Sequence, residues 1–282
     1  MYGYGYQYSA IINGGGGGAA PFVGLLDDYP TAAAAYSLRK LRNGYSGNAI
    51  RVRRSSDNAE LNIGFVDNVL DTATLTTFAS GTNAFITNFY DQSGNGVDLF
   101  RSVAVGQPQI VASGVIITDS GKPTLSFPNG NSLLHTSGFT ELLIPAEWTI
   151  SFVSKADAAQ TYSATLGDAV GDNQDGMLIF GSQLRTKINN VNYGVFGSGD
   201  NRTKTRLWTN IRNSSNTITI NRDGTSYGSV SSAVGSFDFV QIGSSIEVNQ
   251  PDFFSELIIW KSDQTSNLSG IETNINTYYG VY

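Results

Sequence analysis

Short apolar runs separated by turn residues fill the sequence from residue 122 to residue 260. The clearest pair of runs is joined by Asp223-Gly224, a dipeptide suited to a two-residue hairpin turn. Such spacing is typical of an antiparallel β-sandwich, so we expect an all-β fold. The expected strands span residues 123–127, 148–154, 163–166, 177–180, 207–211, 217–221, 237–242 and 254–260.

Three segments outside this series carry helix signals. Thr31 precedes an alanine-rich run, so residues 32–42 are expected to form a helix with Thr31 as its N-cap. Asp71 is a suitable N-cap for a short helix that reaches Phe78. Residues 269–279 place their apolar side chains on one helical face, which predicts an amphipathic helix at the end of the domain.

The charge composition narrows the choice of partners. Only 14% of the 282 residues are charged, and the net charge is −6. Because such a chain has no overall positive field to hold a phosphate backbone, we expect no nucleic acid partner. The sequence has no cysteine, which excludes disulfides and thiolate metal sites. No apolar run approaches the roughly 20 residues of a membrane span, and we expect a soluble chain without an export signal.

The first 20 residues differ in composition from the rest. Five consecutive glycines occupy residues 14–18, and four tyrosines alternate with Gly or Gln at the start of the segment: Tyr2, Tyr4, Tyr6 and Tyr8. One interpretation is a disordered tail. The other is an arm whose tyrosines bind another protein, since tyrosine offers contact area at low entropic cost. We therefore divide the chain into an arm (1–20) and a sandwich domain (21–282), which opens with a helix and strand segment (31–99).

A cluster of basic residues lies near the start of this domain, where six of the 17 Lys and Arg residues fall between Tyr36 and Ser55. Residues 49–53 alternate apolar and charged, which predicts a strand with its arginines outward. Further on, an aspartate begins a Gly- and Asn-rich turn, where it is expected to bind the turn's own amides or to pair with a nearby arginine. A structural role is expected for Arg51, Arg53, Arg54, Asp91 and Gln92.

Two long motifs carry a resemblance to known proteins. IRVRRSSDNA spans residues 50–59, and YDQSGNGVDL spans residues 90–99. These motifs resemble the opening of the α-L-arabinofuranosidase B catalytic domain, and they also resemble the same segment in a group of tailed-bacteriophage virion proteins. Both resemblances imply a concanavalin A-like (laminin-G-like) antiparallel jelly roll with a few short helices.

Glycosidases need two carboxylates on either side of the sugar cleft. The resemblance places a nucleophilic glutamate after Gly-Met in a strand, and the matching run here is GMLIFG, in which Leu178 occupies that position. Because leucine cannot attack an anomeric carbon, the resemblance implies a scaffold without catalysis. We therefore expect no enzymatic activity, and a glycoside hydrolase of the α-L-arabinofuranosidase type is the alternative.

Candidate binding residues are few. His135 has no second His or Cys with which to form a catalytic triad or a transition-metal site. The close spacing of Asp168, Asp172 and Asp175 makes calcium a weak candidate, although ordinary turn chemistry explains the same residues, and no other cofactor is expected. The residues best suited to carbohydrate are Tyr162, Tyr193, Tyr227, Asp172 and Asn173.

These observations favour a structural component of a bacteriophage virion, either a tail or a capsid appendage. Such a protein is made in the host cytoplasm and leaves in the virion by lysis, which agrees with the missing export signal. Its arm would bind other virion proteins, and its sandwich would face outward as a lectin-like domain for host glycans. A homo-oligomer in the particle is expected.

Overall fold

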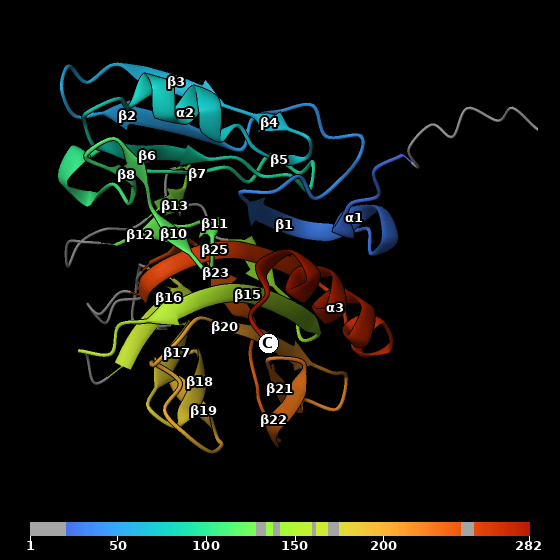
Figure 1. Cartoon of the computed structure of the whole chain (residues 1–282). Helices are drawn as coiled ribbons and strands as arrows, with labels where there is room; N and C mark the ends of the chain where they lie inside the picture. The colour runs from blue at the N-terminus through green and yellow to red at the C-terminus, as the bar shows by residue number, and fades with distance from the viewer. Residues whose placement is uncertain (1–20, 128–133, 138–141, 160–161, 169–174, 244–250) are drawn as a thin grey trace, which may run out of the picture.

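The computed structural model describes residues 21–127, 134–137, 142–159, 162–168, 175–243 and 251–282. Most of its regular structure is antiparallel β-sheet, and the expected all-β sandwich is confirmed. Figure 1 shows β2, β3 and β6 at one end of the molecule and the hairpins β17–β19 and β21–β22 at the other. In the described part of the chain, no helix is long and apolar enough to cross a membrane.

The first half of the domain contains twelve strands, most of them short. They are β1 (Ala32–Ser37), β2 (Ile50–Arg54), β3 (Glu60–Ile63), β4 (Phe65–Val66), β5 (Val69–Leu70), β6 (Ala84–Phe89), β7 (Leu99–Phe100), β8 (Gln109–Ala112), β9 (Val115–Ile116), β10 (Thr118–Asp119), β11 (Lys122–Pro123) and β12 (Leu125–Ser126).

The second half contains the longer strands. They are β13 (Leu134–Thr136), β14 (Leu142–Ile144), β15 (Trp148–Ala156), β16 (Tyr162–Gly167), β17 (Gly176–Phe180), β18 (Gln183–Ile188), β19 (Val191–Phe196), β20 (Arg206–Arg212), β21 (Ile218–Arg222), β22 (Thr225–Val230), β23 (Phe237–Phe239), β24 (Gln241–Ile242) and β25 (Pro251–Trp260). The helices are α1 (Leu25–Asp28), α2 (Thr72–Phe78) and α3 (Leu268–Tyr279), with 3₁₀ turns at Ala104–Gly106 and Thr265–Asn267.

Strand β25 lies between two hydrophobic cores. Successive side chains of a strand point to opposite faces, and every residue of β25 from Phe254 onward is buried. Leu257 and Ile259 pack into the large core between the sheets. Ile258 and Trp260 pack into a second core with residues of α1 and α3, and Figure 1 shows α3 beside β15 and β25. From Leu257 to Trp260 the strand is therefore apolar on both faces, as expected for a central position in the fold.

Residues 32–37 form strand β1, so the helix expected over residues 32–42 is wrong. One edge of β1 pairs with β25. Its other edge is held by the turn after β6, because Ala35 N donates to Asp91 Oδ1 (2.9 Å) and Gln92 N donates to Ala35 O (2.8 Å). Pairing at both edges satisfies the strand's backbone groups, and this overrides the high helix propensity of alanine.

The fully buried side chain of Gln92 extends this contact past the end of β1. Its Oε1 accepts a hydrogen bond from Leu41 N (2.8 Å), and its Nε2 donates to Ser37 O (2.9 Å) and Arg39 O (3.0 Å). The amide thus replaces a strand neighbour for three buried backbone groups. We call the contacts of Asp91 and Gln92 with residues 35–41 the β1 clamp.

Elements with strong local signals agree with their predictions. Asp71 caps α2 by accepting from Thr74 N, and α3 ends at Gly280, whose φ of 62° is left-handed. The hairpin β21–β22 turns at Asp223 and Gly224, with φ values of 53° and 75°. Positive φ at both central residues is what a type I′ turn requires.

A buried ion pair joins the segment after β1 to β25. Arg39 Nε and Nη2 donate to the two carboxylate oxygens of Glu256 at 2.8 and 2.9 Å. Ser37 Oγ also donates to Glu256 (2.6 Å), and Arg39 Nη1 donates to Asn274 Oδ1 of α3 (2.8 Å). These bonds hold the end of β1, β25 and α3 together. Removal of either Arg39 or Glu256 would leave the other charge buried without its counter-charge.

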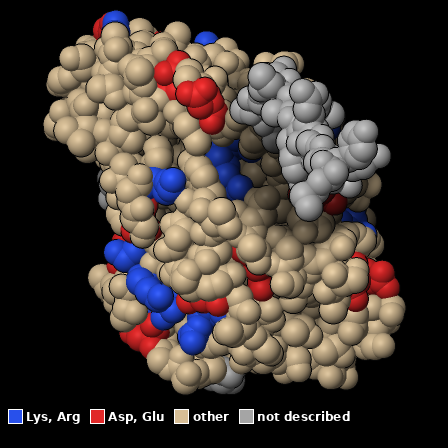
Figure 2. Space-filling model, turned by 45° about the vertical axis from the view of Figure 1, so that its right-hand side comes forward, with Lys and Arg blue, Asp and Glu red and all other residues tan. Residues whose placement is uncertain are grey.

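Figure 2 shows one face of the molecule, where charged side chains form small separate groups on a mostly uncharged surface. Residues 1–20, and with them Tyr2, Tyr4, Tyr6 and Tyr8, lie outside the described residues. The arm, its partners, the domain division at residue 20 and the homo-oligomer therefore stay predictions.

Replacement of Gln92 tests the β1 clamp. Gln92→Leu fills a similar volume but leaves three buried backbone groups without a partner, so we expect the free energy of unfolding to fall by about 3 kcal/mol. Denaturant unfolding measures the change, and Gln109→Leu, which removes one hydrogen bond from a half-buried side chain, is the matched control. Equal effects of the two substitutions would contradict the clamp.

Candidate functional site

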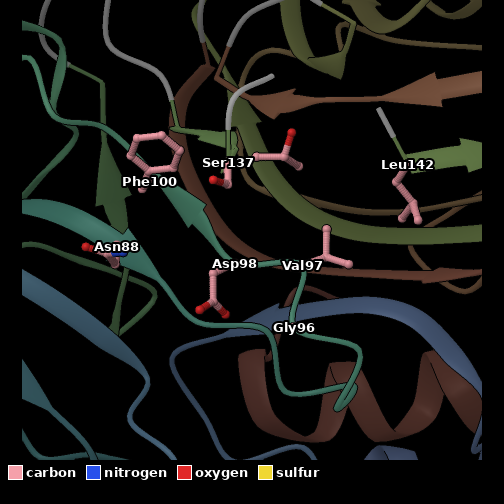
Figure 3. A pocket seen from close by; sticks show the side chains of 8 residues that line it. Asn88, Gly96, Val97, Asp98, Phe100, Ser137 and Leu142 are labelled. Atoms are coloured by element: carbon pink, nitrogen blue, oxygen red, sulfur yellow. The ribbon is translucent and has the colours of Figure 1, made fainter. Parts of the chain in front are cut away.

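A hollow of about 610 Å³ opens where β6 and β7 meet the ends of β13 and β14. Figure 3 shows Asp98 between two pairs of side chains, with Asn88 and Phe100 on one side and Val97 and Leu142 on the other. We call this hollow A. Its lining residues are Asn88, Gly96, Val97, Asp98, Phe100, Thr136, Ser137 and Leu142.

Strand register explains why these residues meet. Arg51 of β2 lies opposite Asn88 of β6, Asn88 lies opposite Phe100 of β7, and Phe100 lies opposite His135 of β13. His135 in turn lies opposite Gln241 of β24. Residues directly opposite each other in antiparallel strands share a face of the sheet. One row of mostly polar side chains therefore crosses five strands and passes through hollow A.

His135 lies next to Gln241 in the buried part of this row and is 4% exposed. Its Nδ1 is 2.9 Å from Thr136 O, and its ring meets the Phe100 ring edge-on with the centroids 4.4 Å apart. Burial lowers the pKa of His135, the contact with Thr136 opposes this, and the charge of Arg101 lowers it further. The lowered pKa favours the neutral imidazole, and the ring contact helps to hold Phe100 in place.

Asp98 is the acidic group among the residues that line hollow A. It follows the turn that begins at Asp91, and its Oδ1 accepts a hydrogen bond from Asp91 N (2.8 Å). Burial raises the pKa of Asp98, the bond from the Asp91 amide opposes the rise, and the charge of Asp91 adds to it. A carboxyl group that keeps its proton above its usual pH range can serve as a general acid.

A second hollow of about 240 Å³ adjoins the first, and we call it hollow B. The two hollows share Asn88 and Phe100. The lining residues of hollow B are Glu60, Thr87, Asn88, Phe100, Arg101, Ser102 and Gln107. Glu60 brings a second carboxylate to this surface, where its Oε2 lies 2.7 Å from Arg51 Nε.

The charges of these acidic groups affect two nearby tyrosines. Burial raises the pKa of Tyr90, Arg51 opposes the rise, and both Asp98 and Glu60 add to it. Burial, followed by the charge of Asp98, raises the pKa of Tyr45 to about 12. Tyr90 is therefore within electrostatic range of both Asp98 and Glu60.

Every predicted motif residue lies in the N-terminal strands or the β1 clamp. Arg51 pairs with Glu60, while the other two arginines bind Gln107, Asn58 and Asp57. The carboxylate of Asp91 accepts from Ala35 N, from Ser93 N and Oγ, and from Val97 N. Arg51, Arg53, Arg54, Asp91 and Gln92 thus hold strands and turns together.

Of the predicted carbohydrate residues, Tyr193 and Tyr227 line neither hollow A nor hollow B. Tyr193 was expected to bind carbohydrate as an exposed side chain, but it is only 8% exposed and its hydroxyl accepts a hydrogen bond from Val234 N. Tyr227 packs edge-on against Trp208 and donates to Ser182 O, which commits both its ring and its hydroxyl. Tyr162 lies in β16. Asp172 and Asn173 lie outside the described residues.

The weak calcium candidate has two described members. Asp168 and Asp175 are 2% and 1% exposed, and Asp172 lies outside the described residues. The carboxylate of Asp175 accepts from Asn189 N and Asp238 N, both at 2.6 Å. Burial raises the pKa of Asp175 to about 7, against the effect of these two bonds. In the described part of the chain, no group of three His, Cys, Asp or Glu residues could hold a metal ion.

Sequence reasoning missed Asn88, Asp98 and Phe100 as site residues. Asp98 stands inside the YDQSGNGVDL motif, so the motif was found without a role for its last acidic residue. Asn88 is a polar residue in a strand with buried neighbours, which is the one local signal that marks it. The meeting of these residues depends on strand register, which connects positions far apart in the sequence.

The family model described as "Alpha-L-arabinofuranosidase B, catalytic" matches residues 26–119. This segment contains every residue of hollow B and five of the eight that line hollow A. No curated protein sequence matches the chain significantly.

Solved structures of arabinofuranosidases share the fold over most of the chain. A mutant GH54 α-L-arabinofuranosidase soaked with 4-nitrophenyl α-L-arabinofuranoside has a TM-score of 0.67 and 14% identity, and covers 86% of this chain. An arabinofuranosidase complexed with arabinofuranosyl-α-1,2-xylobiose has a TM-score of 0.64 and 15% identity. This chain spans 62% of the length of each of these structures.

These findings correct two expectations. The interpretation as a bacteriophage virion component is wrong, because the family match and the structural similarities point to an arabinofuranosidase-like glycoside hydrolase domain and give no support to a phage origin. The expectation of a non-enzyme is contradicted by the same findings. The expectation of a non-enzyme relied on Leu178 alone, whereas the similarity to arabinofuranosidases extends over far more of the chain.

Replacement of Asp98 tests its burial. The carboxyl is harder to ionise in the folded chain, so its cost to stability is absent below the unfolded pKa of about 4 and grows as pH rises through the raised folded pKa. Asp98→Asn keeps an acceptor for Asp91 N and should raise the free energy of unfolding at pH 7, with little change at pH 3. Denaturant unfolding at both pH values measures this.

Asp57→Asn is the control with the opposite sign. Bonds from Arg54 and Ala59 lower the pKa of Asp57 to about 2, so its loss should destabilise the fold at pH 7 and have less effect as pH falls toward 2. If Asp98→Asn also lowered stability at pH 7, Asp98 would not carry a buried charge.

Proposed function

We propose that this chain is a glycoside hydrolase domain that cleaves α-L-arabinofuranosides at hollow A. The observation that carries the proposal is the position of Asp98 and Glu60. Both carboxyl residues lie in the segment 26–119 that matches the arabinofuranosidase family model, and they line two adjoining hollows.

Hydrolysis of a glycoside requires one carboxyl group that gives a proton to the leaving oxygen and a second that attacks the sugar or activates water. Asp98 suits the first role because burial raises its pKa, which favours the protonated form that a general acid needs. Glu60 suits the second because Arg51 Nε, 2.7 Å from its Oε2, holds the carboxyl group in position beside hollow B. As the glycosidic C–O bond breaks, Asp98 gives its proton to the leaving oxygen, and Glu60 either bonds to the anomeric carbon or takes a proton from the attacking water. In both cases the oxygen of water ends on the anomeric carbon, and its protons replace the one that Asp98 gave up and complete the sugar hydroxyl.

The remaining lining of hollow A suits a small sugar. Asn88, Thr136 and Ser137 offer hydrogen-bonding groups for hydroxyls, while Phe100 and Leu142 supply apolar surface for the ring carbons. A mixture of a few polar groups with apolar walls is usual for small-molecule sites.

The proposed catalytic residues do not lie in β17. Leu178 stands where the resemblance would place a nucleophile, and its side chain is 1% exposed in the core. A leucine provides neither a nucleophile nor a proton, so any hydrolysis by this chain must use carboxyl groups elsewhere in the chain. This is the reason for the assignment to Asp98 and Glu60.

Two substrates separate the proposed roles. With 4-nitrophenyl α-L-arabinofuranoside the leaving group needs little protonation, so Asp98→Asn should lose little activity. With arabinofuranosyl-α-1,2-xylobiose the leaving group is a sugar, and the same substitution should lower kcat/KM by about 10²- to 10⁴-fold. Glu60→Gln should inactivate the protein toward both substrates, as measured by nitrophenolate and arabinose release.

Asp263→Asn is the matched control, because Asp263 is a carboxylate at the turn before α3 that lines neither hollow. No hydrolysis of either substrate by the unmodified chain would overturn the proposal. Binding of the substrates without cleavage would leave a sugar-binding domain.

A further inference from the structure

Hollow B is positively charged in an acidic chain. Three arginines stand at or beside it, namely Arg51, Arg53 and Arg101, against one carboxylate, Glu60. The whole chain has a net charge of −6. We propose that hollow B binds the carboxylate of an acidic sugar, a uronic acid, linked to the arabinofuranosyl unit in hollow A. The assignment of that unit to hollow A rests on the proposed function.

Arg101 is the residue that would bind the carboxylate. Its backbone is fixed at both ends, since its N donates to Thr87 O (2.9 Å) and its O accepts from Gln107 Nε2 (2.9 Å). Its guanidinium lies against Gly106, where an added Cβ would be 2.5 Å from Nε. Arg101 is therefore held over a surface that leaves no room for a side chain.

The guanidinium of Arg101 has no ion-pair partner among the described residues, and its Nε is buried without a hydrogen bond. An arginine carries five N–H donors in a planar fork. Buried donors without an acceptor cost free energy, so the group gains most from a ligand that supplies oxygen atoms. Arg101 is half-buried and lines hollow B, so a ligand can reach the part of the guanidinium that faces the hollow.

Arg53 adds a second positive charge beside hollow B. Its Nε donates to Gln107 Oε1 (2.8 Å) and its Nη1 to Asn58 Oδ1 (2.8 Å), so both contacts are to uncharged amides. Gln107 is 2% exposed and joins Arg53 to the backbone of Arg101. Of the three arginines, only Arg51 has a carboxylate partner among the described residues, which leaves two positive charges near the hollow without one.

The geometry favours a carboxylate on a neighbouring sugar. The arginine fork matches the two oxygens of a carboxylate. Hollows A and B share Asn88 and Phe100, so a sugar in hollow B would be attached directly to the one in hollow A. A sulfate ester also offers oxygen atoms, but they are arranged tetrahedrally and do not form the planar pair of a carboxylate.

The test uses binding, which does not require catalysis. Methyl β-D-glucuronide and methyl β-D-glucoside differ in the carboxylate, and each can be titrated into the full ¹⁵N-labelled chain. The glucuronide should shift the Arg101 Nε signal and bind about tenfold more tightly than the glucoside. Arg101→Gln should remove this preference, Arg101→Lys should keep part of it, and a rise in salt should weaken it.

Arg185→Gln is the matched control. Arg185 of β18 also has no ion-pair partner among the described residues, and its guanidinium lies over the Phe180 ring away from hollow B. This variant should keep the preference for the glucuronide. Thermal unfolding of each variant checks that it is folded.

Equal binding of the two glycosides, or a preference that survives Arg101→Gln, would overturn the inference. Tighter binding of methyl glucoside 6-sulfate than of the glucuronide would overturn the choice of a carboxylate. An Arg101-dependent preference in a chain that hydrolyses no arabinofuranoside would retain the acidic-sugar site and remove only the proposed function.

Discussion

The hydrogen bonds from Asp91 and Gln92 to the segment around β1 are the contacts on which the rest of the structure depends. They close the free edge of β1, whose other edge pairs with the central strand β25. The same Asp91 carboxylate orders the turn that follows, by accepting from Ser93 and Val97, and its backbone amide holds Asp98. A single short motif thus attaches the N-terminal strands to the sandwich and positions the acidic group of hollow A.

The buried charges of the structure are of two kinds, those with a counter-charge and those without one among the described residues. Arg39 and Glu256 are buried together, and hydrogen bonds satisfy both, so their cost of burial is offset. Asp98 and Arg101 are partly buried at the hollows without a counter-charge among the described residues. Groups that cost stability without an internal partner are typical of functional sites, because a ligand can supply what is missing.

Local and long-range signals account for what the sequence could and could not predict. The turn at Asp223-Gly224, the N-cap at Asp71 and the end of α3 at Gly280 are local features, and they were predicted correctly. Strand β1 was predicted as a helix because its partners lie more than 50 residues away, in the β1 clamp and in β25. The row through Asn88, Phe100 and His135 also needs strand register, which no local pattern contains.

The central claim is that hollow A holds an arabinofuranosyl unit beside Asp98. A crystal structure of the Asp98→Asn variant soaked with arabinofuranosyl-α-1,2-xylobiose tests this most directly. The account predicts density for the arabinofuranosyl ring among Asn88, Phe100 and Thr136, with its glycosidic oxygen near position 98. Density for the sugar elsewhere on the molecule, with hollow A unoccupied at saturating ligand, would contradict it.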